Sequence, residues 1–426
     1  MKTKRIPIKS VIFVACIVAQ LLCSHKSSAA TYSEACQNEK GNYPIDYVIK
    51  YCLYLVDQQK KALKELESIS SGDDLQREKK TLILHRSGLG AAYRKNEQFD
   101  LDIDEQNAIL SLDPQNGAAA YNLAADYYEI GDYDRAIKVI TPILKADPRN
   151  LDALAARGYS YHSKGMYDLA IADYTAGLQI DGNATDALNN RAASYNAKGQ
   201  YDLAVVDAQK AINLDPKFSN AHRQYGTASG ELGKYDSAIE EFTKAIDLLP
   251  TYAFAYADRG VAYFNKGDFD QALIDFDAAI NLETEESKNV DILFYRGMTY
   301  LYSDDNNHAL ADLSLVVRLK PDYFAAFNYR GLLLLALKGY GAAIQDFNEA
   351  IRISPNYVDA HLHLAEAYLA QGDATAATAE FNKVIQLNTK YQPFLDEAQQ
   401  ALASVKANVP FNQQPRPGAR LSFILK

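Results

Sequence analysis

The feature that most constrains the fold is a sequence pattern that recurs every 34 residues. From residue 117 onward, similar stretches fall in one register, among them RGYSYHSKGMYDLAIADY (157–174) and RGVAYFNKGDFDQALIDF (259–276). Eight such units fill 117–391, with a three-residue insert at 287–289, and one degenerate unit precedes them at 83–116. A fixed period of this length indicates a repeat protein in which each unit packs on its neighbours.

Each unit is predicted to form two helices joined by a turn. A small residue recurs in the first half, such as Gly158 or Gly260, and another in the second half, such as Ala170. Small residues let two helices approach closely and leave notches that receive a ring of the facing helix, and we expect first-helix tyrosines such as Tyr161 to fill these notches. In six units a glycine stands where a left-handed residue would end the first helix. These are Gly131, Gly165, Gly199, Gly233, Gly267 and Gly372.

The pattern resembles the tetratricopeptide repeat family, over about 70% of the chain. The matching residues in the unit that starts at 253 are Gly260, Tyr263, Gly267, Phe269, Ala272, Phe276 and Ala279. The departures are the absence of Trp and the residues Thr284, Asp304, Asn306 and Thr389. The resemblance implies an all-α fold, a right-handed superhelical solenoid of stacked helix-turn-helix repeats with a concave inner face. About nine repeats are expected over 83–391.

Residues 1–30 are predicted to be a signal peptide. Basic residues such as Lys2 and Lys9 precede an apolar run at 11–22, and small residues follow at 27–30. The apolar run is shorter than the roughly 20 residues of a membrane span, so no stable membrane insertion is expected after cleavage. The alternatives are an uncleaved anchor and a lipid anchor. We expect an exported protein, periplasmic in the first instance, with secretion or the secretory-pathway lumen as alternatives.

The segments that flank the repeats are assigned by pattern. Residues 31–82 form an N-terminal helical cap or a further degenerate repeat, with a helix near 44–66. Cys36 and Cys52, the cysteines left after signal cleavage, predict one disulfide, and two buried unpaired thiols are the alternative. Residues 392–406 fit a C-terminal capping helix, and 407–426 fit a flexible tail.

Charge and motifs exclude several classes of function. The formal net charge of −10 becomes about −15 once residues 1–30, with five Lys or Arg and no acid, are removed. Such a chain repels nucleic acid. The sequence contains no nucleophile-elbow, Walker or zinc-protease motif, so neither catalysis nor a cofactor is expected. His361 and His363 lie two apart on a helix and point in different directions, so no metal site is expected.

Arginine and aspartate vary together between units. Five units carry both residues, 16 positions apart, and units that lack the arginine also lack the aspartate. The pairs are Arg157 with Asp173, Arg191 with Asp207, Arg259 with Asp275, Arg296 with Asp312, and Arg330 with Asp346. This covariation predicts ion pairs between the two helices of one unit, with an arginine row that binds anions as the alternative.

The face of the first helix that points away from the second helix is the predicted binding surface. The helical phase places amides and aromatic rings there, which favours binding of an extended or helical peptide. The set is Tyr121, Asn122, Asn189, Asn190, Arg223, Gln224, Phe254, Asp258, Phe294, Tyr295, Asn328 and Tyr329. The first hypothesis is therefore a non-catalytic scaffold for a peptide or partner protein. The alternatives are an accessory subunit of cell-envelope polysaccharide or peptidoglycan machinery, and a protein similar to secretory-pathway co-chaperones.

Overall fold

The structure is a computed structural model that describes residues 45–66, 72–282, 290–387, 396 and 399–404. Within these ranges every element is an α-helix. The chain divides into two compact units, unit 1 up to Lys198 and unit 2 from Gly199. The signal peptide, Cys36 and the tail at 407–426 lie outside the described residues, so the expectations about them stay predictions. Cys52 is fully buried in the core of unit 1.

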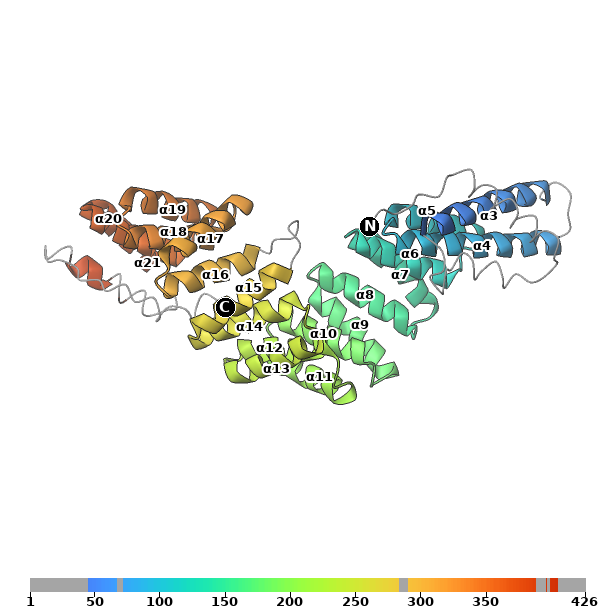
Figure 1. The fold of residues 1–426 in the computed structure, drawn as a ribbon, viewed down its shortest axis with the longest axis horizontal. Helices are drawn as coiled ribbons and strands as arrows, with labels where there is room; N and C mark the ends of the chain where they lie inside the picture. Colours follow the sequence, from blue (N-terminus) through green and yellow to red (C-terminus); the bar gives the residue numbers. More distant parts are fainter. Residues whose placement is uncertain (1–44, 67–71, 283–289, 388–395, 397–398, 405–426) are drawn as a thin grey trace, which may run out of the picture. The chain divides into compact units, whose positions relative to one another are not determined.

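Unit 1 is a run of helices in which each packs against the next (Figure 1). The helices are α3 (Ile45–Leu66), α4 (Gly72–Lys95), α5 (Phe99–Leu112), α6 (Gly117–Glu129), α7 (Tyr133–Ala146), α8 (Leu151–Ser163), α9 (Tyr167–Ile180) and α10 (Thr185–Ala197). Helix α3 covers the helix expected near 44–66. Helix α4 begins well before residue 83, and it packs against both α3 and α5.

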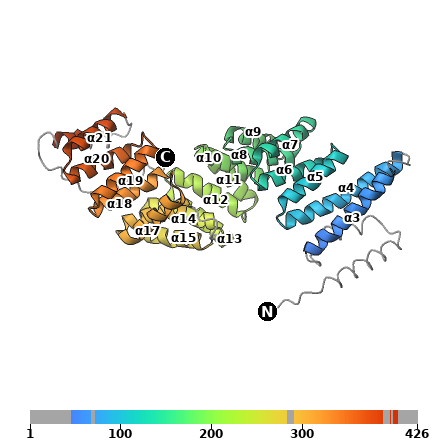
Figure 2. The ribbon, with the colours of Figure 1, turned by 90° about the horizontal axis from the view of Figure 1, so that it is seen from above.

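Unit 2 continues the same alternation of first and second helices (Figures 1 and 2). The helices are α11 (Tyr201–Leu214), α12 (Ser219–Glu231), α13 (Tyr235–Leu248), α14 (Ala253–Lys266), α15 (Phe269–Leu282), α16 (Val290–Tyr302), α17 (Asn306–Leu319), α18 (Phe324–Ala336), α19 (Tyr340–Ile353), α20 (Val358–Gln371) and α21 (Ala374–Gln386). Ala401 and Leu402 are buried against the last pair, in one cluster with Phe381. The fold is the expected all-α solenoid of helix-turn-helix repeats.

The turns inside the repeats confirm the predicted left-handed residues. All six predicted glycines have positive φ, from 73° at Gly165 to 94° at Gly372. Three units have another residue there, and Glu97, Asp304 and Lys338 adopt the same conformation at φ of 57° to 63°. A side chain disfavours this conformation. The repeat geometry therefore imposes the turn even where the local sequence opposes it.

The notches at four first-helix glycines are filled by rings of the second helix, so the expectation that first-helix tyrosines such as Tyr161 fill the notches is wrong at these positions. A Cβ added to Gly260 would lie 2.8 Å from Cε1 of Phe276, and one added to Gly226 would lie 2.7 Å from Cε1 of Phe242. Phe276 is fully buried, whereas Tyr161 is only half-buried. The ring lies 16 residues after the glycine, on the facing helix, which is why it can reach the notch.

The close contact at Gly260 predicts a large effect of one methyl group. We expect Gly260→Ala to destabilise unit 2 by about 1–3 kcal/mol, because the added Cβ would push against the fully buried ring of Phe276. The measurement is chemical denaturation followed by circular dichroism. The matched control is Gly341→Ala in α19, where an added Cβ meets nothing within 4 Å. It should leave stability unchanged or slightly raised, and equal losses in both variants would contradict this account of the core.

Candidate functional site

The twelve predicted surface residues differ widely in exposure. Tyr121 and Phe254 are 41% and 52% exposed. Six more are half-buried: Asn122, Asn190, Arg223, Gln224, Asp258 and Tyr295. The other four are buried, and for these the expectation of an open surface is wrong: Asn189, Phe294, Asn328 and Tyr329.

Packing between neighbouring repeats explains the burial of the residues in unit 2. The ring of Phe294 in α16 lies 5.6 Å from the ring of Tyr329 in α18 and 5.0 Å from that of Tyr323. Asn328 of α18 forms a 3.0 Å hydrogen bond with Nδ1 of His363 in α20. The prediction considered the two helices of one repeat, whereas the first helix of the next repeat covers these positions.

One group of predicted residues does come together at an accessible place in unit 2. Arg223 Nε of α12 donates to Asp258 Oδ2 of α14 over 2.7 Å. The guanidinium carbon also lies 5.2 Å from the centre of the Phe254 ring and 5.8 Å from that of Tyr252. Tyr252 donates to Asn220 over 2.6 Å, which fixes its ring beside the arginine. We call these five residues the α12–α14 cluster.

The electrostatics of the α12–α14 cluster keep its arginine charged. Burial acts to lower the pKa of Arg223, but the attraction of Asp258 outweighs it and the pKa is raised. Close by, burial is the main cause of the raised pKa of Tyr295, and the charges of Asp291, Glu231 and Asp258 add to it. The surroundings of the cluster are therefore acidic, with one fixed cation between two rings.

Unit 1 carries a tyrosine surface that the prediction included only in part. Tyr121 and Asn122 of α6 line a hollow of about 400 Å³ together with Asn150 and Asp152. Tyr159 of α8 is 43% exposed, and its ring centre lies 4.7 Å from that of Tyr128 in α6. Burial raises the pKa of Tyr128 to about 12. The aromatic residue at 159, where no other unit has an aromatic residue, was the signal that could have added it.

Asn122 also belongs to a buried polar group that the sequence did not reveal. Arg94 of α4 donates to Asn122 Oδ1 over 3.1 Å and lies 2.8 Å from both Asp102 and Asp126. Both carboxylates are fully buried. Burial first, and then repulsion by Asp102, raise the pKa of Asp126 to about 7. Arg94 is therefore the shared partner of two buried carboxyl groups, and Asp126 is partly protonated near neutral pH.

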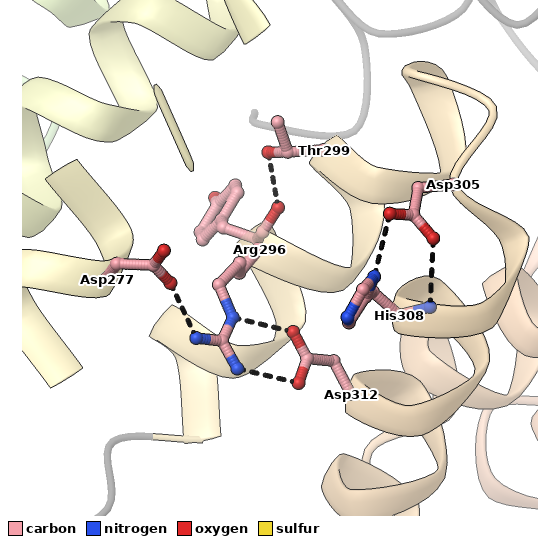
Figure 3. A network of polar contacts seen from close by, with 7 residues as sticks. Asp277, Arg296, Thr299, Asp305, His308 and Asp312 are labelled. Atoms are coloured by element: carbon pink, nitrogen blue, oxygen red, sulfur yellow. Dashed lines mark hydrogen bonds and ion pairs between the residues drawn. The ribbon is translucent and has the colours of Figure 1, made fainter. Parts of the chain in front are cut away.

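The predicted arginine–aspartate pairs are confirmed in four of the five cases. Nε and Nη2 of the arginine each donate to the aspartate at 2.7–2.9 Å, so the row does not present free guanidinium groups to anions. Arg296 also donates to Asp277 of the preceding repeat over 2.7 Å (Figure 3). Arg191 and Asp207 belong to different units, so their pairing stays a prediction.

The described part of the chain contains neither a cluster of metal ligands nor a membrane-spanning helix. His361 bonds Glu380, and His363 bonds Asn328. No cluster of three or more His, Cys, Asp or Glu within these residues is arranged to hold a metal ion. None of the described helices is long and apolar enough to cross a membrane.

Fold and surface together define an α-helical repeat protein with aromatic and polar groups on its first helices. Sequence models of the tetratricopeptide repeat match residues 121–185, 185–218, 226–267, 253–285, 336–372 and 358–391. The chain belongs to the tetratricopeptide repeat family. No curated protein matches the sequence as a relative.

Solved structures of similar fold agree with this assignment. A chain of the APC/C hetero-tetramer Cut9–Hcn1 is 18% identical, with a TM-score of 0.54 over 87% of this chain and 72% of that chain. A tetratricopeptide repeat protein from Parabacteroides merdae is 19% identical, with a TM-score of 0.50 over 59% and 98%. MamA is 28% identical, with a TM-score of 0.34 over 39% and 98%. The first two matches show the fold alone.

Removing Arg259 alone should cost more stability than removing both Arg259 and Asp275. Burial raises the pKa of Asp275 even though the hydrogen bonds from Arg259 act to lower it, so desolvation offsets much of the attraction. We expect Arg259→Ala to destabilise unit 2 by about 1–3 kcal/mol, and the double change with Asp275→Ala to destabilise it less. A double-mutant cycle in urea measures the coupling, and strictly additive losses would contradict the pairing.

The shared arginine in unit 1 predicts a pH dependence. Because the folded pKa of Asp126 is raised to about 7, the stability that its proton provides is present at low pH and lost as pH rises from about 4 to 7. Asp126→Asn should remove that dependence and stabilise unit 1 at pH 8 by about 1–3 kcal/mol. Melting curves at pH 5 and pH 8 measure this. Asp134→Asn, at an exposed aspartate of α7, is the control and should change neither curve.

Proposed function

We propose that the chain is a non-catalytic scaffold that binds a peptide segment of a partner protein on the first helices of unit 2. The observation that carries this proposal is the α12–α14 cluster. Its Phe254 ring is more than half exposed next to a charged guanidinium that Asp258 holds in place. Aromatic and arginine side chains are the commonest anchors in protein interfaces. Membership of the repeat family supports the same class of function.

The chemistry of the cluster indicates what the segment contributes. An apolar or aromatic side chain of the partner would pack on Phe254, and Arg223 and Asn220 offer polar groups beside it for a backbone or side chain. The arginine is positioned before binding, because Asp258 and two rings fix it, so little side-chain entropy is lost on association. The acidic surroundings favour a partner without strong negative charge.

The compartment belongs to the same proposal. A signal peptide at 1–30 would place the scaffold outside the cytoplasm, in the periplasm as the first case, and the cysteine pair Cys36 and Cys52 suits an oxidising compartment. The secretory pathway is the alternative.

A second candidate is an accessory role in cell-envelope polysaccharide or peptidoglycan machinery, and unit 1 provides the observation that favours it. Exposed Tyr121 lines one hollow with the amides and carboxylate of Asn122, Asn150 and Asp152, and Tyr159 is exposed on α8, the helix that carries Asp152. Rings beside hydrogen-bonding groups also suit a sugar chain. If glycan binds, titration with peptidoglycan fragments should give an affinity that falls in Tyr121→Ala and is unaffected by changes in unit 2.

The test of the scaffold is a paired substitution in the α12–α14 cluster. Partners captured from the envelope fraction of the source by wild-type protein should bind Arg223→Ala/Phe254→Ala about 10- to 100-fold more weakly, as expected for loss of two anchor residues. Circular dichroism and melting temperature should stay close to wild type, because both side chains are partly exposed.

The matched control is Asp247→Ala/Ile274→Ala, which removes one charged and one apolar side chain from exposed positions of α13 and α15. It should bind every partner at wild-type affinity. Retention of wild-type affinity by the cluster variant would overturn the proposed surface, and equal losses in both variants would point to the second helices instead.

A further inference from the structure

Two histidines of unit 2 form the same two hydrogen bonds, one from each ring nitrogen. His222 of α12 lies with Nδ1 2.6 Å from Glu241 Oε2 of α13 and Nε2 3.0 Å from the carbonyl oxygen of Pro216. His361 of α20 repeats this, with Nδ1 2.7 Å from Glu380 Oε2 and Nε2 3.0 Å from the carbonyl oxygen of Pro355. Each ring therefore connects the turn before its repeat to both helices of that repeat.

The partners of these rings determine their protonation state. A carboxylate and a backbone carbonyl are both acceptors, so each ring nitrogen must donate a hydrogen for both bonds to form. A neutral imidazole has only one N–H and can satisfy one of the two partners. The geometry at His222 and His361 is therefore that of the imidazolium.

The histidine arrangement replaces the arginine–aspartate pair in the first and last complete repeats of unit 2, α12–α13 and α20–α21, here called its end repeats. Glu241 and Glu380 occupy the repeat position that aspartate occupies in the three repeats between them, where Arg259, Arg296 and Arg330 are the partners. Arginine stays charged throughout the range in which proteins are folded, whereas histidine changes charge near neutral pH. The middle of unit 2 is thus joined by pairs that do not titrate and its ends by pairs that do.

The groups around each ring act in opposite directions. The hydrogen bond that His222 donates to Glu241 is the largest cause of the raised pKa of His222, the bond to the Pro216 carbonyl adds to it, and burial and Lys244 act against it. For His361 burial is the largest effect and lowers the pKa, as does Lys383. The bonds to Glu380 and the Pro355 carbonyl outweigh both, so the pKa of His361 is raised. Both rings are only 5% exposed.

We propose that His222 and His361 act as pH-dependent clasps that keep the two end repeats of unit 2 closed when they are protonated. Loss of the proton leaves either the carboxylate or the carbonyl without the hydrogen that the ring donates to it, and at Glu241 only the bond from Lys244 to the other oxygen remains. The turn before α12 or α20 is then held less firmly against the helix pair.

The direction of the effect follows from the folded-state pKa. A histidine whose pKa is raised by folding contributes stability that is fully present below its unfolded value of about 6.5. That contribution is lost as pH rises through the folded pKa. The end repeats should therefore be protected at mildly acidic pH and open more readily in mildly alkaline solution, whether or not a partner binds.

The test begins with wild-type protein and needs no variant that might misfold. An NMR titration of the full chain should show two histidines with pKa values above 6.5. Hydrogen exchange, expressed as protection factors, should show α12 and α20 losing about tenfold protection for each unit by which the folded pKa exceeds the unfolded one. Helices α16 and α18 should show no such change between pH 5.5 and pH 8. Histidines that titrate at or below 6.5, or end helices with constant protection, would overturn the proposal.

Variants then locate the effect. His222→Gln should remove the pH dependence of protection in α12 and leave that in α20, and His361→Gln should do the reverse, because glutamine does not titrate. His308→Gln is the matched control, since His308 is an exposed histidine that bonds Asp305 in the first turn of α17. A pH dependence that survives in both glutamine variants would assign the effect to other groups.

Discussion

The contact between a small residue on one helix and a ring on the next sets the spacing of the helix pairs. In four repeats the glycine notch faces a ring so closely that a Cβ would come within 2.8 Å of it: Tyr174, Phe242, Phe276 and Phe347. Because a fully packed ring cannot yield, this spacing is fixed in each repeat. The second helix can then hold its aspartate within bonding distance of the arginine next to the glycine, so the ion pairs depend on the notch.

Repetition is why the fold could be predicted from one sequence. The period, the small residues and the six glycines all indicated the same hairpin, and agreement between such levels is what specifies a structure. Asp304 and Lys338 also adopt the left-handed turn conformation of the repeat, although their residue types alone would not predict it. The ring at the glycines was not predicted, because the prediction named first-helix tyrosines such as Tyr161 as the facing rings, whereas the ring at Gly158 is Tyr174 of α9.

The candidate site was less predictable, for a definite physical reason. The phase of a helix says which face turns away from its own hairpin, but the next repeat covers part of that face. Phe294 and Asn328 are buried by such contacts, whereas Phe254 remains exposed. The partner of Arg223 lies 35 residues away on the next first helix, and this distance carries no recurrent pattern in the sequence. The histidine clasps were missed likewise, because only the arginine units were compared as pairs.

Contacts between repeats therefore limit where such a chain can hold a partner. Arg259 and Arg296 each bond the aspartate of their own repeat. Each also bonds a residue of the preceding repeat, Thr243 or Asp277, so these arginines join neighbouring repeats. A side chain that joins neighbouring repeats is poorly available to a ligand, since recruiting it would leave a buried acid unpaired. Arg223 also joins two repeats, but its partner Asp258 is partly exposed, so recruiting Arg223 would leave no buried acid unpaired. Recognition in this chain is accordingly expected at the few first-helix positions, such as Phe254 and Tyr159, at which the side chain contacts the neighbouring repeat and still stays exposed.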